Sequence, residues 1–344
     1  MVMNTAGGAG GSSNAFGTAT IKTAWDQFFR MALRHRPLFR ESLVDVRPAD
    51  VTSPGQTVTL FKHKDIAPGV DDPSNAANIL GDFVDPTPVT FNTPDTVNVT
   101  VNEYGRELIH SKLLRETSLA NVMQYQAEQV AYNMENELDR YVRFVAKGGT
   151  NVRYSSDGAG LPDNATNALE YTDKITSDDI RSVVADLETA AVAPKRDEFY
   201  VCYIHPHVAM DLRRETGSLG WRDPHTYSAP NLIWKGEVGV YERCIFVQTG
   251  RAYAAQDGAA TGGASGGVAY VYRTLIVGRE ALVEATAVEP GLVYTEKVGQ
   301  DFFNRQYALG WYGILGWARF REEALRRIES GSSKDGAGIA AGGN

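Results

Sequence analysis

Residues 118–147 read SLANVMQYQAEQVAYNMENELDRYVRFVAK and carry the strongest helical pattern in the chain. Apolar side chains recur there at steps of three and four residues, which places them on one face of a helix. These positions are Leu119, Met123, Ala127, Val130, Met134, Leu138, Tyr141 and Val145. Ser118 is a favourable N-cap, and Gly148 with Gly149 favours termination. The pattern predicts an amphipathic rod of roughly 40 Å, long enough to brace a thin domain.

After this helix, alternating helix and strand patterns predict a small α+β domain over residues 175–285. Its helices and strands are expected over 177–191, 199–204, 206–214, 244–248 and 268–277. The glycine- and alanine-rich run 258–267 is typical of a surface loop. The closing segment 281–329 is rich in strand formers, and we expect it to return to the long helix.

Before the helix, residues 50–105 have the composition of extended chain. Two strands are expected at 57–61 and 97–101, joined by about 30 polar, proline- and glycine-containing residues, 62–93. A connection this long is typical of a projecting functional loop, because most connections are shorter than about 15 residues. A two-stranded arm is at best marginally stable alone. We therefore expect a neighbouring copy of the chain to hold it.

The two ends of the chain have a different character. Residues 1–17 and 331–344 are tracts of glycine, alanine, serine and asparagine, and both are expected to be flexible. Between the first tract and Pro37, residues 21–33 predict an amphipathic helix with Trp25, Phe28 and Phe29 on one face.

Composition limits the classes of function. The 344 residues include 34 Lys and Arg against 42 Asp and Glu, a formal net charge of -8, so the whole surface has no drive toward DNA or anionic membrane. Cys202 and Cys244 lie in apolar segments, which predicts that both are core residues and that the protein is found in a reducing compartment. No secretory leader and no run of 18 apolar residues is found, so we expect a soluble chain made in a cytoplasm, with no membrane partner.

None of the motifs that could indicate a catalytic, metal or phosphate site matches the pattern that such a site requires. Gly263–Gly267 matches the spacing of a serine-hydrolase elbow, but it precedes a strand instead of following one. His205 and His207 flank Pro206 at a helix entry without further metal ligands, and Asp71, Asp72 and Asp82 lack the alternating ladder of a calcium loop. No Gly-Lys pair exists for a phosphate loop. We predict no catalytic residue, cofactor or metal; the alternative is a cytoplasmic hydrolase built on the α+β domain.

Several short stretches, taken in order, resemble the major capsid protein of tailed bacteriophages, specifically the family related to the coat protein of N4-like phages. They are Tyr104-Gly105-Arg106, Asn136-Glu137-Leu138-Asp139, Ile204-His205-Pro206 with Asp211-Leu212-Arg213, Gly236-Glu237-Val238-Gly239 with Phe246-Val247-Gln248-Thr249, Leu275-Ile276-Val277-Gly278-Arg279 and Leu309-Gly310-Trp311. Together they span roughly residues 20–330. The resemblance implies an α+β protein with the Hong Kong 97-type capsid fold.

That fold divides the chain into named parts. The resemblance implies an N-terminal arm (1–48, of which 1–17 is flexible), an extended β-hairpin loop (49–105), a peripheral domain (106–174 and 286–330) with its spine helix at 118–147, an axial α+β domain (175–285) and a flexible tail (331–344). It also implies hexamers and pentamers that self-assemble into an icosahedral shell around double-stranded DNA. An encapsulin-like shell protein is the related alternative.

The same resemblance sets expectations for partners and location. About 20 residues precede the first expected helix, so a scaffolding protein would be a separate chain, alongside a portal and a decoration protein. Packaged DNA would be contacted without sequence specificity. The chain would reside in the virion capsid after synthesis and assembly in the bacterial host cytoplasm. No local signal marks a covalent cross-link from Lys62 or Lys64 to a late asparagine such as Asn304.

Residues expected at subunit contacts are aromatic, apolar or basic side chains of the arm, the projecting loop and the α+β domain. They are Trp25, Phe28, Phe29, Phe61, Lys62, Lys64, Ile66, Val70, Ile79, Leu80, Phe83, Trp221, Arg222 and Tyr227.

Overall fold

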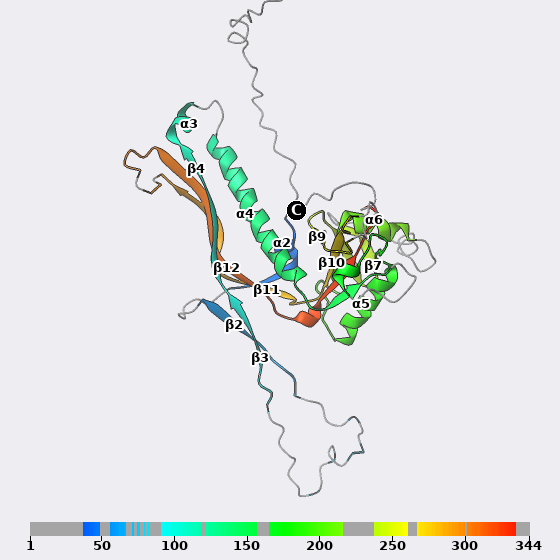
Figure 1. Ribbon diagram of the computed structural model, residues 1–344. Helices are drawn as coiled ribbons and strands as arrows, with labels where there is room; N and C mark the ends of the chain where they lie inside the picture. The colour runs from blue at the N-terminus through cyan, green and yellow to red at the C-terminus, as the bar shows by residue number, and fades with distance from the viewer. Residues whose placement is uncertain are drawn as a thin grey trace, which may run out of the picture. The chain divides into compact units, whose positions relative to one another are not determined.

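The computed structural model describes residues 37–48, 56–66, 71, 74–75, 79, 82, 91–117, 122–156, 165–215, 237–260, 267–296, 298–299 and 301–334 (Figure 1). All of them belong to the unit formed by residues 35–344. The helix expected over 21–33 lies outside the described residues.

A four-stranded sheet has the order β1-β11-β12-β4. Its strands are β1 (Val44–Pro48), β4 (Asn102–Ser111), β11 (Leu282–Thr295) and β12 (Gln306–Arg319). Strand β1 pairs parallel with β11, and the other neighbours pair antiparallel. A long-range parallel pair requires a crossover, so residues near the start of the described chain are locked against a strand more than 200 positions later.

The long helix α4 (Val122–Lys147) packs against this sheet (Figure 1). Val130 and Leu138 from the helix are buried with Leu309, Trp311 and Leu315 from β12. The predicted helix is therefore present up to its expected end at Lys147, while residues 118–121 lie outside the described part. The expected return of the closing segment to the helix is confirmed by the same contacts.

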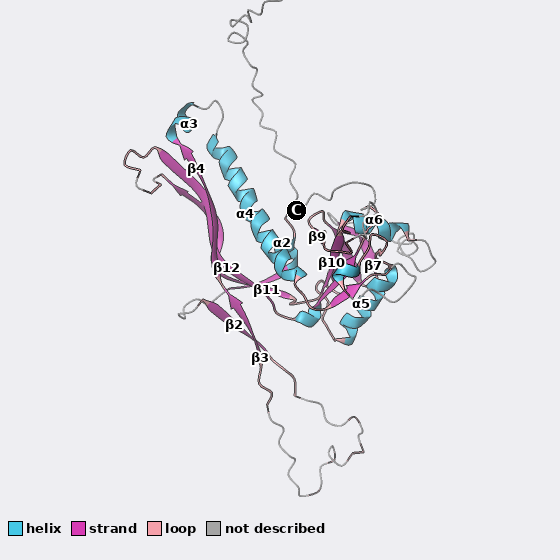
Figure 2. Cartoon of the chain, in the orientation of Figure 1, coloured by secondary structure: helices cyan, strands magenta, loops and turns pink. Residues whose placement is uncertain are grey.

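A second sheet has the order β5-β13-β10-β6-β8-β7, with β9 paired to β10. Its strands are β5 (Val152–Tyr154), β6 (Tyr200–Ile204), β7 (Glu237–Tyr241), β8 (Cys244–Gln248), β9 (Ala254–Ala255), β10 (Val271–Val277) and β13 (Leu325–Ser330). Helices α5 (Ser177–Thr189) and α6 (Pro206–Arg214) pack on it. Figure 2 shows this mixture of helices and strands. The segments expected at 199–204, 206–214 and 244–248 match β6, α6 and β8 within one residue.

Both cysteines belong to the core of this second sheet. Cys202 and Cys244 are fully buried beside Tyr200 and Phe246, as the sequence predicts. Burial raises the pKa of Cys244 to about 12, so its thiol is unreactive at neutral pH.

The second sheet recruits strands from outside residues 175–285. Strands β5 and β13 fall within the ranges that the resemblance gives to the peripheral domain, yet both are hydrogen-bonded into the sheet beside β10. The chain also stays ordered past residue 331, where a flexible tail is expected. Ser332 is buried and donates to Asp211 on α6 (2.7 Å), and the Ser333 amide donates to the same carboxylate (2.9 Å).

The two expected arm strands pair as an antiparallel hairpin of β2 (Thr57–Lys62) and β3 (Asp95–Thr100). Its base is held by its own chain, because Val99 and Val101 are buried against Val283, Ala285 and Phe320. Strand β3 crosses close to β12, where a Cβ added at Gly316 would lie 2.3 Å from the Thr100 carbonyl oxygen. Glycine is needed at this crossing.

The remaining described elements are short. They are α2 (Phe39–Leu43), α3 (Lys112–Thr117), η1 (Thr166–Ala168) and η3 (Glu322–Ala324). Where the two sheets and the end of α4 meet, α2 contributes Phe39 and Leu43 to a buried cluster with Val142, Tyr203 and Leu282.

Candidate assembly interface

The junction between the sheets is organised around Asp139, a carboxylate of α4 with no exposed surface. Its Oδ1 accepts hydrogen bonds from the backbone amides of Leu38 (2.9 Å), Phe39 (2.6 Å) and Arg40 (3.3 Å), so it caps α2 from a distant helix. Its Oδ2 accepts from the Arg251 Nε at 2.8 Å. One side chain thus ties the first described helix and the turn after β8 to the long helix.

A second carboxylate, Glu284 on β11, is also fully buried and accepts several hydrogen bonds. The Arg40 guanidinium binds it through Nη2 (2.7 Å) and Nε (3.0 Å), and this hydrogen bonding raises the pKa of Arg40. Trp317 Nε1 (2.7 Å) and Thr286 Oγ1 (3.1 Å) donate to the same carboxylate. Both carboxylates are fully satisfied, which is the condition under which buried charge is tolerated.

We expect Asp139→Ala to lower the free energy of unfolding of the chain by about 3–5 kcal/mol, because the buried Arg251 loses its carboxylate partner and keeps only the neutral oxygens of Asn136, and three amides lose their acceptor. Urea denaturation followed by circular dichroism measures this. Arg243→Ala, which removes an exposed pair with Glu188, is the matched control and should cost at most about 1 kcal/mol. Equal effects of the two variants would contradict a central role for Asp139.

The hairpin presents large apolar side chains to solvent. Phe61, Ile66, Ile79 and Phe91 are all exposed, with Phe91 at 78%. Lys64 pairs with Asp95 on the same hairpin at 2.7 Å. The Lys62 ammonium contacts the Glu323 carboxylate of η3, so this basic residue is already engaged within its own chain. Large exposed apolar side chains on one arm are typical of contact surfaces.

A second exposed apolar group, which we call the tip, lies where β4 ends and β12 begins. It comprises Ile109, Leu113, Leu114, Phe302 and Phe303, the two phenylalanines being 88% and 74% exposed. The Lys112 amide donates to the Arg305 carbonyl (2.7 Å), which holds α3 beside the turn that carries both rings. The sequence reasoning missed this group, although two adjacent phenylalanines in a polar turn are a detectable signal.

Beneath the tip, His110 is buried and stacks on Tyr307 with ring centroids 5.7 Å apart. Neither ring nitrogen has a hydrogen-bond partner among the described residues. Burial, and then the nearby Arg115, lowers the pKa of His110, so the ring is neutral at neutral pH.

Many of the residues expected at contacts lie outside the described part. Trp25, Phe28, Phe29, Val70, Leu80, Phe83, Trp221, Arg222 and Tyr227 belong to this group. Phe61, Lys64, Ile66 and Ile79 are exposed, which is compatible with the expectation, whereas Lys62 is half-buried against Glu323. The contact role of all five stays a prediction.

The motifs weighed for chemistry have structural explanations where they are described. His205 is the N-cap of α6, its Nδ1 accepting the His207 amide at 3.2 Å, and burial lowers its pKa to about 4. His207 Nδ1 lies 2.9 Å from the Tyr272 hydroxyl. Asp71 and Asp82 are exposed, while Asp72 and residues 263–266 are outside the described part.

Two kinds of feature are absent from the described residues. None of their helices is long and apolar enough to span a membrane. They also contain no cluster of three or more His, Cys, Asp or Glu side chains placed to hold a metal ion.

Comparison with solved structures finds the same fold in phage capsids. The capsid of cyanophage Pam1 matches with a TM-score of 0.66 at 14% identity, covering 92% of this chain and 98% of that one. The capsid of Ralstonia phage GP4 gives 0.63 at 15% identity (94% and 99%), and a structure from Mycobacterium phage Che8 gives 0.60 at 13% (90% and 97%). The search of curated proteins found no match.

The family described as phage capsid protein matches residues 95–332, well over half of the chain. This range includes β3, α4 and most of both sheets. The chain therefore belongs to the phage capsid protein family: it is a tailed-phage major capsid protein, structural and not enzymatic in its role.

Proposed function

We propose that this chain forms hexamers and pentamers that close into an icosahedral shell around double-stranded DNA. The proposal includes the Hong Kong 97-type division into arm (1–48), extended loop (49–105), peripheral domain (106–174 and 286–330) and axial domain (175–285), and membership of the N4-like branch. The family match favours this role over an encapsulin-like shell or a hydrolase.

The observation that carries the proposal is the hairpin β2–β3. Its base is buried in its own subunit through Val99 and Val101, whereas Phe61, Ile66, Ile79 and Phe91 farther along are exposed. A monomer gains nothing from ordering such residues in water. A second copy that covers them would recover the apolar burial, and repetition around a ring would make each modest contact effective.

The tip offers a second contact surface at another place on the subunit. Leu113, Leu114, Phe302 and Phe303 would be covered by a neighbouring copy, because surfaces of this kind rarely stay solvated in a working assembly. Two separate apolar surfaces fit a closed shell, which needs contacts within and between rings.

The partners proposed are those of a phage shell: a separate scaffolding protein, a portal, a decoration protein and DNA contacted without sequence specificity. A formal net charge of -8 supports weak, non-specific contact with the genome. Assembly would take place in the cytoplasm of the bacterial host, and the assembled chain would reside in the virion capsid.

Self-assembly is tested by negative-stain electron microscopy with light scattering on the purified chain, with and without a co-expressed scaffolding protein. We expect closed polyhedral shells, or rings of five and six subunits. A chain that stays a monomer or dimer under every condition would overturn the proposal.

A further inference from the structure

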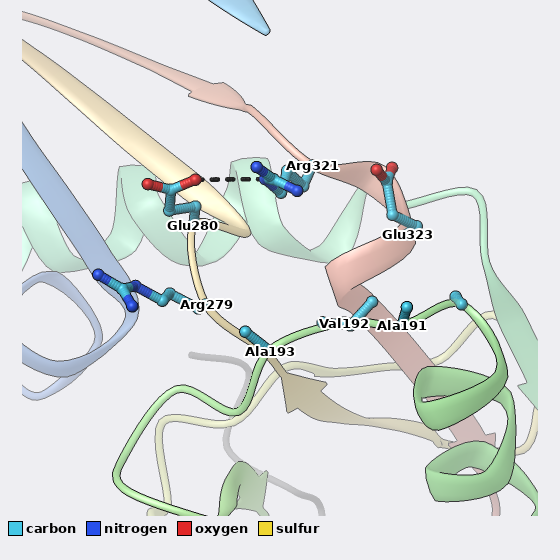
Figure 3. A pocket seen from close by; sticks show the side chains of 8 residues that line it. Ala191, Val192, Ala193, Arg279, Glu280, Arg321 and Glu323 are labelled. Atoms are coloured by element: carbon cyan, nitrogen blue, oxygen red, sulfur yellow. Dashed lines mark hydrogen bonds and ion pairs between the residues drawn. The ribbon is translucent and has the colours of Figure 1, made fainter. Parts of the chain in front are cut away.

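A polar pocket of about 260 Å³ lies where three turns meet (Figure 3). The turn after α5 contributes Ala190, Ala191, Val192 and Ala193, the turn between β10 and β11 contributes Arg279 and Glu280, and the entry of η3 contributes Arg321 and Glu323. The small side chains of the first turn leave the charged groups of the other two accessible.

Both turns that face each other across the pocket hold non-glycine residues in the left-handed region. Ala191 has φ 51° and Glu280 has φ 56°. Such backbone is strained and persists where the surroundings fix it. The Arg279 amide donates to the Ala193 carbonyl (2.9 Å), so the two turns are joined directly. The pocket is therefore a fixed feature and not a gap between mobile loops.

Two arginines and two glutamates line the pocket, and three of these four side chains are already paired. Arg321 pairs with Glu280 at 3.2 Å, and Glu323 binds Lys62 from the loop end of β2, outside the lining. Arg279 is exposed and has no ion-pair partner among the described residues. After the two pairs are accounted for, one guanidinium remains at the pocket to receive an anion, and a carboxylate suits its planar fork.

A source of carboxylates is present in the chain itself. Residues 65–94 contain five aspartates, Asp65, Asp71, Asp72, Asp82 and Asp85, and no lysine or arginine. Asp65, Asp71 and Asp82 are exposed and have no ion-pair partner among the described residues. A loop that carries only negative side-chain charges is attracted to a surface that carries a positive charge.

We propose that this pocket seats an aspartate from the hairpin loop of a second copy of the chain, with Arg279 binding its carboxylate. The inference rests on the proposed function, since the loop must meet a neighbouring subunit. About 15 extended residues on each side of the loop give it a reach of roughly 50 Å. Because the lining residue Glu323 also binds Lys62 at the end of β2, each pocket would lie beside one subunit's own hairpin and receive its neighbour's loop.

Charge reversal tests the proposal. Arg279→Glu is expected to leave a folded subunit but to lower shell yield roughly tenfold or more, since it places a like charge against the loop. Adding Asp71→Lys and Asp82→Lys should restore much of the yield. Lys174→Glu, which makes the same charge change at an exposed lysine outside the pocket lining, is the control and should assemble normally.

A disulfide experiment identifies the copy that supplies the loop. Arg279→Cys combined with Asp71→Cys, or with Asp82→Cys, should give multimers on a non-reducing denaturing gel after particles are oxidised. Both native cysteines are buried, so Arg279→Cys alone should give none.

The outcomes separate this inference from the proposed function. If the unmodified chain forms shells and Arg279→Glu does so equally well, or if neither double-cysteine variant links chains, the pocket assignment is wrong while the shell function stands. If the unmodified chain never assembles, the proposed function fails first and the inference falls with it.

Discussion

Replacing Leu138 with aspartate is expected to leave the chain unable to fold. Leu138 is 1% exposed at the centre of the face that α4 presents to β12, against Leu309 and Trp311. Losing the leucine costs about 2–5 kcal/mol, and a carboxylate without a partner in the same place adds several more. The sum is comparable to the whole stability of an ordinary domain, about 5–15 kcal/mol.

Soluble yield and circular dichroism of the purified chain measure the effect. Phe144→Asp is the matched control, because Phe144 lies on the same helix but is 65% exposed, and this variant should keep the wild-type spectrum. Met134→Asp should be intermediate, since Met134 packs at the edge of the same cluster and is only partly buried. A folded, soluble Leu138→Asp chain would show that α4 does not brace the sheet.

The elements that the sequence predicted well are those whose periodicity is local. Helix α4 follows from eight apolar positions in steps of three and four, and α6 follows from a proline at its start with histidine before it. Strands β6 and β8 are short apolar runs between clear breaks; β6 is buried along its whole length, and β8 is buried at Cys244 and Phe246. In each case one stretch of residues contains all the information needed.

Sheet membership could not be predicted, because it depends on partners far away in the chain. Strand β13 looks like a continuation of the closing segment, yet it pairs with β10 and carries Glu329, which Arg273 binds at 2.8 Å. Strand β1 pairs with β11 across more than 200 residues. Strand β4 was missed as well, since its alternation is weak and most of its side chains are exposed.

The same limit applies to functional residues. Asp139 was noticed only as part of a family motif, and its three backbone partners belong to residues about 100 positions away. The pocket at Arg279 joins three turns that are remote in sequence. Of the two described phenylalanines that the hairpin exposes, the sequence predicted Phe61 as a contact residue but not Phe91, which is the more exposed.

Removing the hairpin loop is expected to abolish closed shells without unfolding the subunit. In the deletion, residues 63–94 are replaced by Asn-Gly, which closes Lys62 and Asp95 with a tight turn suited to paired strands. The deletion keeps every strand pair of the hairpin, from Thr57–Thr100 at one end to Lys62–Asp95 at the other. It also keeps the burial of Val99 and Val101 at the base. The melting temperature should therefore change by only a few degrees.

Light scattering and negative-stain microscopy then separate folding from assembly. If Ile66, Ile79 and Phe91 of the loop bind a neighbouring copy, the shortened chain should remain as subunits or open fragments at concentrations where the full chain closes. Shortening residues 261–266, a glycine-rich connection in the other sheet's domain, is the matched control and should leave shells intact. The deletion removes only contacts that a second copy could make, and it leaves the buried core of the subunit unchanged. Particles of normal size would therefore falsify the interlocking role of the hairpin, although the fold of the subunit would still stand.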